Sequence, residues 1–501
     1  MRNLKVALTV ACAVVVGWAF IASADCRVTL DGRTLPVHAA RVSARPINQV
    51  WAGYQRPVSQ TEMASFVSFD LAAGGELGVL PDERDAQGEP VVLPLSFRPE
   101  IRQEGGIWTI RVDRPRQFAV SFGKDAPVLH VFANPPFVAP KGGKIRRFGP
   151  GEHDVGLVCV GSDETVVIEE GAVVYGAIQV LNATNAKIVG RGIVDASRLN
   201  RADHASAAYR SALAAGLTPG FYGAEMAVTA FTAVGSTNVL VEGVTFRDPP
   251  RWTMIVRAQC RGVTIDNVKV IGCWRYNSDG INVCSSEDVT IRNSFVRSFD
   301  DCIVARGSYL DGCTGPTRNV LAENCVLWCD WGKNLEVWAG HKPCLIENVT
   351  FRNIACVYPG QTACDVTTWF ASPDTTIRGV TMEDIEFDYA RTRWAYHYQK
   401  NPDDAVYRGR PIRSSTLFRV DVVSYGRDLG NQRLEPAKDL SSFRVAYSNL
   451  TFRNFRCLGD VPKLNAVIDA TTAPHTVEGV TLENLPKELR LKSAGLSVPK
   501  P

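Results

Sequence analysis

Short runs of β-branched residues alternate with polar positions along the chain, and no long segment shows the period of an amphipathic helix. From residue 136 onward the runs form an imperfect repeat, in which an alternating stretch, a bend of Asn or Gly and a second stretch follow one another. Examples are Val263–Val270, Val289–Val296 and Val320–Leu327. Successive runs begin about 25 to 31 residues apart, a period typical of solenoids. The pattern predicts a right-handed parallel β-helix over 136–501; a β-sandwich or a propeller is the alternative.

The segment before the repeat shows a different all-β pattern. Alternating runs such as Phe66–Phe69, Trp108–Val112 and Phe118–Phe122 are separated by glycine-rich turns. This favours a small β-sandwich domain over 25–135. Two later segments, 198–232 and 391–447, interrupt the repeat and are expected to shape a cleft.

Residues 1–24 carry the features of a secretory signal peptide. Arg2 and Lys5 precede an apolar stretch that ends in small residues, with a cleavage site before Asp25. A membrane anchor is the alternative, but the apolar run is short for a span. The sequence therefore predicts a secreted or periplasmic protein that does not reside in a membrane.

The composition is that of an ordinary globular chain of 501 residues, with 45% hydrophobic and 21% charged residues. A net charge of +3 is too small to indicate a nucleic-acid partner. The chain has 14 cysteines and seven histidines, and no CxxC pair recurs at zinc-binding spacing. We expect no metal or cofactor, and the oligomeric state stays open. Export permits disulfides, and Cys302 with Cys313 or Cys325 is the pair we predict first.

Three aspartates lie in two short segments that each precede a β-like run. Asp279 stands in Asn277–Gly280, and Asp300 and Asp301 are adjacent about 21 residues later. If each run is one coil of a β-helix, these carboxylates lie on neighbouring strands, about 4.8 Å apart. Such a cluster is what hydrolysis of a glycosidic bond requires.

These segments resemble known motifs. Asn277–Gly280 matches N-T-D-G, Asp300–Cys302 matches D-D-C, Gly190–Asp195 resembles G-x-G-x-I-D, and Arg247–Trp252 resembles N-S-P-x-W. Together they resemble the polygalacturonase-type glycoside hydrolases of family 28 and the related dextranase-type enzymes of family 49. The leading β-domain is more similar to the dextranase arrangement.

The resemblance implies an inverting hydrolase acting on a carbohydrate. Asp300 would be the general acid, and Asp279 and Asp301 would hold and deprotonate the attacking water. Repulsion between clustered carboxylates raises one pKa, as a general acid at neutral pH needs.

The next two coils depart from the pectin-degrading pattern. Lys333 stands where the family has a histidine, and it would either hold a proton or a negative oxygen near Asp301, or orient the aspartates through a salt bridge. Glu336 would bind a sugar hydroxyl or stand idle on the surface. The residues 362–368 lack the family's Arg-Lys pair that binds the sugar carboxylate. We therefore predict a neutral or differently charged glycan rather than plain polygalacturonate.

Several tryptophans recur near the coil ends, where they would either stack on sugar rings or pack the coil ends. Arg306 would bind substrate or neutralise the acids. The substrate-binding candidates are Asn277, Lys333, Glu336, Trp252, Trp274, Arg306, Trp331 and Trp338.

Two other functions stay open at this point. A β-helical polysaccharide lyase would use Lys333 as its base, together with a calcium-binding acidic cluster. A glycan-binding solenoid without activity would not need three acids. The sugar, the linkage and endo or exo action are not determined by the sequence.

Overall fold

The computed structural model describes residues 26–44, 57–81, 88–122, 128–339, 343–360, 362–370, 374–390, 416–428, 434–436, 444–469 and 475–494. The predicted signal peptide and most of the segment 391–447 lie outside this set. No helix in the described ranges is long and apolar enough to cross a membrane.

The first domain packs two five-stranded sheets face to face, in the orders β2-β1-β5-β8-β7 and β3-β4-β10-β9-β6. Their inner faces meet in one apolar core, to which Val79, Ile110 and Val131 contribute. The predicted β-sandwich is confirmed. Its elements are β1 (Arg27–Leu30), β2 (Arg33–Thr34), β3 (His38–Ser43), η1 (Val58–Gln60), β4 (Thr61–Asp70), β5 (Gly75–Leu80), β6 (Val91–Leu93), β7 (Ile101–Glu104), β8 (Ile107–Val112), β9 (Arg116–Ser121) and β10 (Val128–Asn134).

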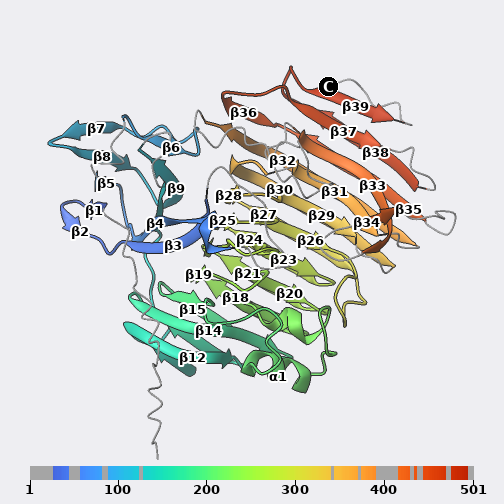
Figure 1. Cartoon of the computed structure of the whole chain (residues 1–501), viewed down its shortest axis with the longest axis horizontal. Helices are drawn as coiled ribbons and strands as arrows, with labels where there is room; N and C mark the ends of the chain where they lie inside the picture. The colour runs from blue at the N-terminus through green and yellow to red at the C-terminus, as the bar shows by residue number, and fades with distance from the viewer. Residues whose placement is uncertain are drawn as a thin grey trace, which may run out of the picture.

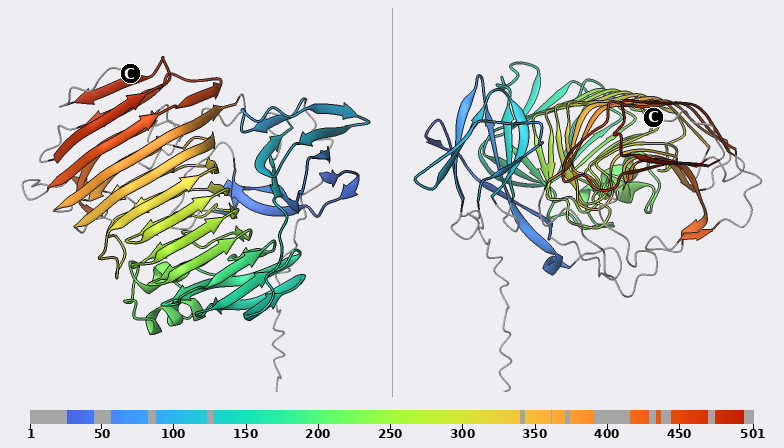
Figure 2. Two further views of the ribbon diagram at one scale, coloured as in Figure 1. Left: turned by 180° about the vertical axis from the view of Figure 1, so that it is seen from behind. Right: turned by 90° about the horizontal axis from the view of Figure 1, so that it is seen from above.

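The remainder is a solenoid of parallel strands, and the sandwich lies against one side of it (Figures 1 and 2). One face stacks β17, β20, β23, β26, β29, β31, β33 and β37 in parallel register. A second stacks β15, β18, β21, β24, β27, β30, β32 and β35. The predicted parallel β-helix is confirmed.

The elements of the solenoid run from β11 to β39. They are β11 (Lys144–Phe148), β12 (Gly151–Cys159), β13 (Glu164–Ile168), β14 (Ala172–Leu181), β15 (Lys187–Gly190), β16 (Ile193–Asp195), α1 (Ala207–Ala214), η2 (Ala224–Ala227), β17 (Phe231–Val234), β18 (Thr237–Glu242), β19 (Thr245–Arg247), β20 (Met254–Arg257), β21 (Arg261–Asp266), β22 (Lys269–Ile271), β23 (Ile281–Cys284), β24 (Glu287–Arg292), β25 (Phe295–Ser298), β26 (Ile303–Arg306), β27 (Thr317–Glu323), β28 (Val326–Cys329), β29 (Lys333–Ala339), β30 (Cys344–Tyr358), β31 (Thr362–Phe370), β32 (Thr375–Tyr389), β33 (Thr416–Asp428), β34 (Leu434–Pro436), β35 (Val445–Arg453), β36 (Arg456–Gly459), β37 (Asn465–Asp469), β38 (His475–Glu483) and β39 (Arg490–Ala494).

Asparagine makes the bend in most of the central coils. Asn293, Asn324 and Asn353 have φ values of 52°, 55° and 50°, the left-handed region that asparagine tolerates better than most residues. Their side chains also bond from coil to coil: Asn353 Nδ2 donates to Asn324 Oδ1 at 2.7 Å. The bend residues of the repeat thus turn the chain and tie adjacent coils together.

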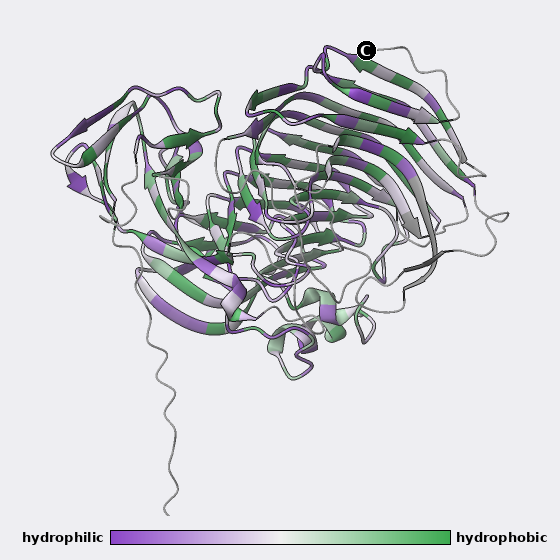
Figure 3. Ribbon diagram, turned by 45° about the horizontal axis from the view of Figure 1, so that its top comes forward, coloured by the Kyte–Doolittle hydropathy of each residue, from purple (hydrophilic) through white to green (hydrophobic). Residues whose placement is uncertain are grey.

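Alternation along each strand sets the core. Val289 and Ile291 of β24 are fully buried and point inward, whereas Arg292 is exposed. The apolar and polar positions of Figure 3 alternate along the stacked strands in the same way. Strands on neighbouring coils pair in register, so the same positions are buried in each coil. Val263, Val289 and Val320 therefore stack in one interior row.

The predicted disulfide among Cys302, Cys313 and Cys325 is wrong, because all three are free thiols. Cys302 Sγ lies 3.0 Å from the Ser298 hydroxyl, and Cys325 donates to the carbonyl of Glu323 at 3.2 Å. Cys313 belongs to a separate apolar cluster. These cysteines act as small apolar residues that occupy different positions around the coil.

Candidate active site

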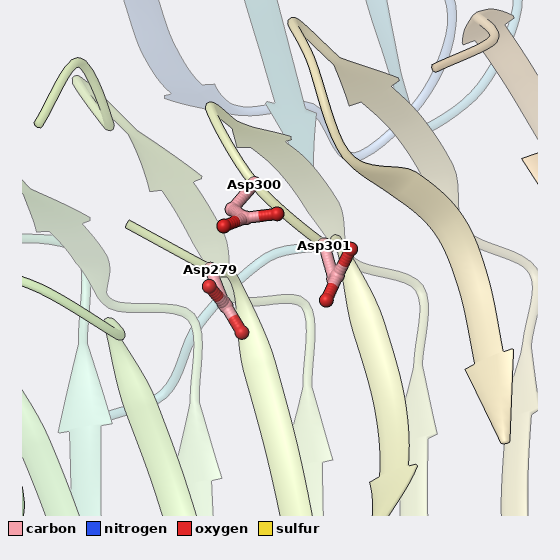
Figure 4. Close-up of side chains that lie close together, drawn as sticks. All are labelled: Asp279, Asp300 and Asp301. Carbon is pink, nitrogen blue, oxygen red and sulfur yellow. The ribbon is translucent and has the colours of Figure 1, made fainter. Parts of the chain in front are cut away.

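The three aspartates lie directly before two adjacent strands on the same face of the solenoid, β23 and β26. Ile281 of β23 pairs with Ile303 of β26, which places Asp279 and Asp301 at equivalent positions on neighbouring coils. Asp300, next to Asp301, points back toward Asp279 (Figure 4). One oxygen from each carboxylate lies within 4.8 Å of the others. The structure therefore gathers the acids that the sequence singled out.

Glycine permits this close approach. A Cβ on Gly280 would lie 2.3 Å from the carbonyl oxygen of Cys302 on the next coil. A Cβ on Gly332 would lie 2.6 Å from the Asp300 carbonyl carbon, on the other side of the acid pair. Both contacts are with backbone and cannot be relieved by a side-chain rotation, so these positions require glycine.

Arg306 at the end of β26 connects the acids. Its NH2 lies 2.9 Å from Asp279 Oδ2 and 3.2 Å from Asp301 Oδ2, and its Nε donates to Asn282 Oδ1 at 2.6 Å. Its guanidinium also lies between two indole rings, 4.4 Å from Trp252 and 4.8 Å from Trp338. Arg306 is 6% exposed and so compensates buried negative charge, the second of its two predicted roles.

The three acids differ in pKa. Burial, and next the charge of Asp301, raise the pKa of Asp300 to about 7. Burial alone would also raise the pKa of Asp301, but the positive charges of Lys333 and Arg306 bring it below its ordinary value. Burial and the two neighbouring carboxylates raise the pKa of Asp279 well above its ordinary value. Adjacent carboxylates with pKa values pushed apart are typical of acid and base roles.

Lys333 starts β29 and orients Asp301. Its ammonium lies 3.3 Å from Asp301 Oδ1 and 3.0 Å from Glu336 Oε1. Of the two roles predicted for Lys333, the structure contains the salt bridge. Glu336 is 1% exposed, so the idle surface position is wrong for this residue. Burial and the charge of Asp301 raise the pKa of Glu336 to about 8.

Asn277 links the acids to the segment 198–232. Its Nδ2 donates to Asp300 Oδ2 at 3.3 Å, and its Oδ1 accepts from Arg201 NH2 at 2.7 Å. Arg201 also donates to the carbonyl of Tyr276 at 2.8 Å. Arg201 was not predicted from the sequence, because an interruption of the repeat was the only signal in the segment 198–232.

The four candidate tryptophans are packed into the protein, with 4% to 5% exposure. Trp252 and Trp338 enclose Arg306, Trp274 Nε1 donates to Asp248 Oδ1 at 2.8 Å, and Trp331 stacks on Phe299 at 5.5 Å. A sugar-stacking role for these four rings stays a prediction, and their low exposure argues against it.

The coil after Lys333 presents an acid. Asp365 of β31 is fully buried and accepts from Arg419 Nε of β33 at 3.0 Å. Asp365 is in register with Glu336 on one side and with Arg419 on the other. Sequence reasoning did not assign Arg419, because a long insertion separates β31 from β33. Arg419 sits two coils beyond Lys333, and its charge is compensated by Asp365.

Comparison with known proteins supports the fold and the family resemblance. Residues 177–388 match the family model "Glycosyl hydrolases family 28". The predicted resemblance to family 28 is confirmed. The matched segment contains both aspartate motifs, Lys333 and Asp365.

Curated relatives are similar at low identity. A "Probable exopolygalacturonase B" from Aspergillus fumigatus is 26% identical over 269 residues, which are 51% of this chain and 50% of the relative. An "Exopolygalacturonase" from Cochliobolus carbonum is 28% identical over 134 residues, 25% of this chain and 28% of that protein. The chain spans about half the length of the first relative that it matches.

A solved structure shows the fold over nearly the whole chain. Dex49A from Penicillium minioluteum superposes with a TM-score of 0.55 and 14% identity, covering 93% of both chains. At this identity the likeness concerns the fold alone: a β-helix with a leading β-domain.

Proposed function

We propose that this protein is a glycoside hydrolase that cleaves O-glycosidic bonds of a poly- or oligosaccharide, with Asp300 as the general acid. The observation that carries the proposal is that two adjacent buried carboxylates have pKa values shifted in opposite directions. Burial raises the pKa of Asp300 to about 7, while Lys333 and Arg306 keep Asp301 ionised. A proton donor and an anionic base within one cluster are what glycoside hydrolysis needs.

In the proposed reaction Asp300 protonates the leaving oxygen as the glycosidic bond breaks. Asp301, held by Lys333 and Arg306, accepts a proton from the attacking water, and Asp279 helps to position that water. Asp279 Oδ1 makes no hydrogen bond with any described residue, which leaves one acceptor for the water. Because the pKa of Asp279 is raised, Asp301 is the stronger candidate for the base.

Inversion of the anomeric carbon is part of this proposal and rests on the family resemblance. Inverting pairs usually have carboxyl groups about 6.5–9.5 Å apart. Here the nearest oxygens of the three acids lie within 4.8 Å of one another. The stereochemical outcome must therefore be measured directly.

We propose further that plain polygalacturonate is not the main substrate, although the names of the relatives refer to it. The coil at 362–368 carries Asp365 and contains neither Arg nor Lys. Arg419, which lies beside it, is already bonded to Asp365. A sugar carboxylate at this coil would therefore meet negative charge, and among the described residues the cation beside it is already engaged.

The structure argues against the lyase alternative. A lyase base must be able to lose its proton. Burial alone would lower the pKa of Lys333, but Asp301 and Glu336 raise it above its ordinary value. Lys333 is thus a fixed cation that holds Asp301, not a proton acceptor.

The test is digestion of a glycan panel that includes dextran, pullulan, arabinogalactan and polygalacturonate. Wild-type protein should release reducing sugar from at least one glycan, without ultraviolet absorbance of unsaturated products and without loss of activity in chelator. Asp300→Asn should lower the rate of release by about 10²–10⁴-fold, whereas Asp113→Asn, in the sandwich domain, should retain it. Proton NMR of the first product identifies the anomer, and retention would exclude the inverting mechanism. Unsaturated products would favour a lyase, and no release from any glycan would favour a binding solenoid.

Export of the protein is also proposed, from the features of residues 1–24. The mature protein should begin at Asp25, which N-terminal sequencing of secreted material would establish. An intact N-terminus on exported protein would instead indicate an anchor.

A further inference from the structure

A chain of aromatic rings begins at Arg306. It includes Trp252, which belongs to the coil before the one that carries Asp279. Trp252 lies two residues before β20, as Asp279 lies two residues before β23, and these strands pair in register. The Trp252 ring stacks on Tyr309 at 6.0 Å with an interplanar angle of 24°. Tyr309 also meets the edge of Trp338 at 4.8 Å. The rings around Arg306 therefore continue outward through Tyr309.

The chain of rings continues onto the segment 198–232. Tyr309 contacts Tyr222 at 5.2 Å, and Tyr222 contacts Phe221 at 5.1 Å, both edge to face. Exposure rises along it: Trp252 is 5% exposed, Tyr309 and Tyr222 are half-buried, and Phe221 is 37% exposed. We name Phe221, Tyr222 and Tyr309 the aromatic ridge.

Phe221 is distinctive in its exposure. Among the described residues it is the only phenylalanine or tryptophan with an exposed side chain. The Phe221 ring also lies 5.3 Å from the guanidinium of the buried Arg251, yet the side chain keeps an exposed face that this packing does not cover. Exposed aromatic rings that continue from an active site are typical of ligand contact.

The ridge is held in place by the backbone around it. The amide of Asp311 donates to the Tyr222 carbonyl at 3.0 Å, which ties the turn after β26 to the segment 198–232. The buried guanidinium of Arg257 donates to the Gly223 carbonyl at 3.2 Å. The rings are thus pre-positioned, which lowers the entropy lost when a ligand binds.

The chemistry on the opposite side of the acids is different. There the coils carry the buried Asp365 and its partner Arg419, with Asp421 at 3.6 Å from Arg419. Charged groups bond to hydroxyls, whereas rings stack on the CH faces of a sugar. A substrate chain lying along the solenoid axis would meet both surfaces of this site.

We propose that the aromatic ridge is a sugar-binding subsite, which stacks on pyranose rings of the substrate on the side of the coil preceding Asp279. The subsite rests on the proposed function, because it extends the same substrate path. Its ligand is a sugar unit away from the cleaved bond, bound through its apolar face and not through charge.

The experiment measures binding separately from cleavage. Affinity electrophoresis of Asp300→Asn in gels containing each soluble polysaccharide of the panel should show retardation by at least one. Adding Phe221→Ala should weaken that binding about three- to tenfold, in line with one lost aromatic contact. Phe221→Trp should restore it, and Ile107→Ala, which removes a similarly exposed apolar side chain from the sandwich, should leave it unchanged.

The outcomes separate the two proposals. The proposal of a sugar-binding subsite is overturned if no polysaccharide retards the protein. It is also overturned if the variant carrying Phe221→Ala is retarded as strongly as Asp300→Asn alone. It is also overturned if Phe221→Trp binds no better than Phe221→Ala. The hydrolase proposal fails on its own if wild-type protein binds a polysaccharide through the ridge but releases no reducing ends from it.

Discussion

The ammonium nitrogen of Lys333 lies 3.3 Å from Oδ1 of Asp301, and the backbone amide of Lys333 donates to the same oxygen at 3.1 Å. One residue thus holds one carboxylate oxygen by both its side chain and its backbone. The side-chain contact adds a charge, whereas the backbone contact fixes the direction of the carboxylate. The pectin-degrading pattern has a histidine at this position. A histidine loses its charge near neutral pH, whereas Lys333 stays positively charged.

Replacing Lys333 by Met should move the acid limb of the pH–activity profile to higher pH. The Lys333 charge lowers the pKa of Asp301, and the base acts only when ionised. Without that charge the pKa rises, and activity is lost at a higher pH as the solution is acidified. Lys333→Arg keeps the charge and is the matched control. The measurement is kcat/KM against pH, and an unmoved acid limb in Lys333→Met would rule out Asp301 as the base.

The alkaline limb should lie near pH 7. Asp300 must carry a proton to act as general acid, and burial raises its pKa to about 7. Activity therefore falls as pH rises through this value. Asp300→Asn removes the proton donor and should lower kcat by about 10²–10⁴-fold with little change in fold. Circular dichroism checks the fold, and an alkaline limb that persists in the residual activity of the variant would assign it to another group.

Removing Arg306 should destabilise the protein most at neutral pH. Arg306→Met removes the guanidinium that lies 2.9 Å from Asp279 Oδ2 and one of the two cations at Asp301, which keeps its contact with Lys333. Breaking a buried ion pair in this way costs about 3–5 kcal/mol. The folded-state pKa of Asp301 is lowered, so its stabilising pairing is present above the ordinary carboxylate pKa and is lost as pH falls through the folded value. Urea unfolding should show a smaller deficit at acid pH than at pH 7. A deficit independent of pH would mean that Arg306 acts through packing between Trp252 and Trp338.

Much of the fold could be predicted from local pattern. In a solenoid each coil contacts only its neighbours, so a short repeat with an Asn bend carries most of the architecture. Asp279 and Asp301 could be placed together for the same reason, since register transfers a sequence spacing into a distance between strands. The bend at Asn293 and the interior row of Val289 follow the same local rule.

Other features depend on contacts that no local pattern contains. The packing of Trp252 and Trp338 around Arg306 joins residues from three coils, and sequence shows only that the rings lie near coil ends. The position of Arg419 beside Asp365 depends on which coil follows a long insertion. A disulfide was predicted because export permits one. The cysteines are instead free thiols, which pack in the interior as apolar residues. Arg201 lies in an interruption of the repeat, where register gives no guidance.

Arg201 offers a test of how the segment 198–232 serves the acids. It donates to Asn277 Oδ1 at 2.7 Å, and Asn277 donates to Asp300 at 3.3 Å, so Arg201 is connected to the proposed general acid through a second side chain. Arg201→Ala should lower kcat about tenfold, as for loss of one positioning contact, with KM for a short substrate almost unchanged. Arg201→Lys should recover only part of kcat, because an ammonium cannot bond Asn277 and the Tyr276 carbonyl in the same forked geometry. Steady-state kinetics with Arg210→Ala as an exposed control in α1 measures this effect. Equal loss in Arg201→Ala and in its control, or a rise in KM alone, would contradict a positioning role.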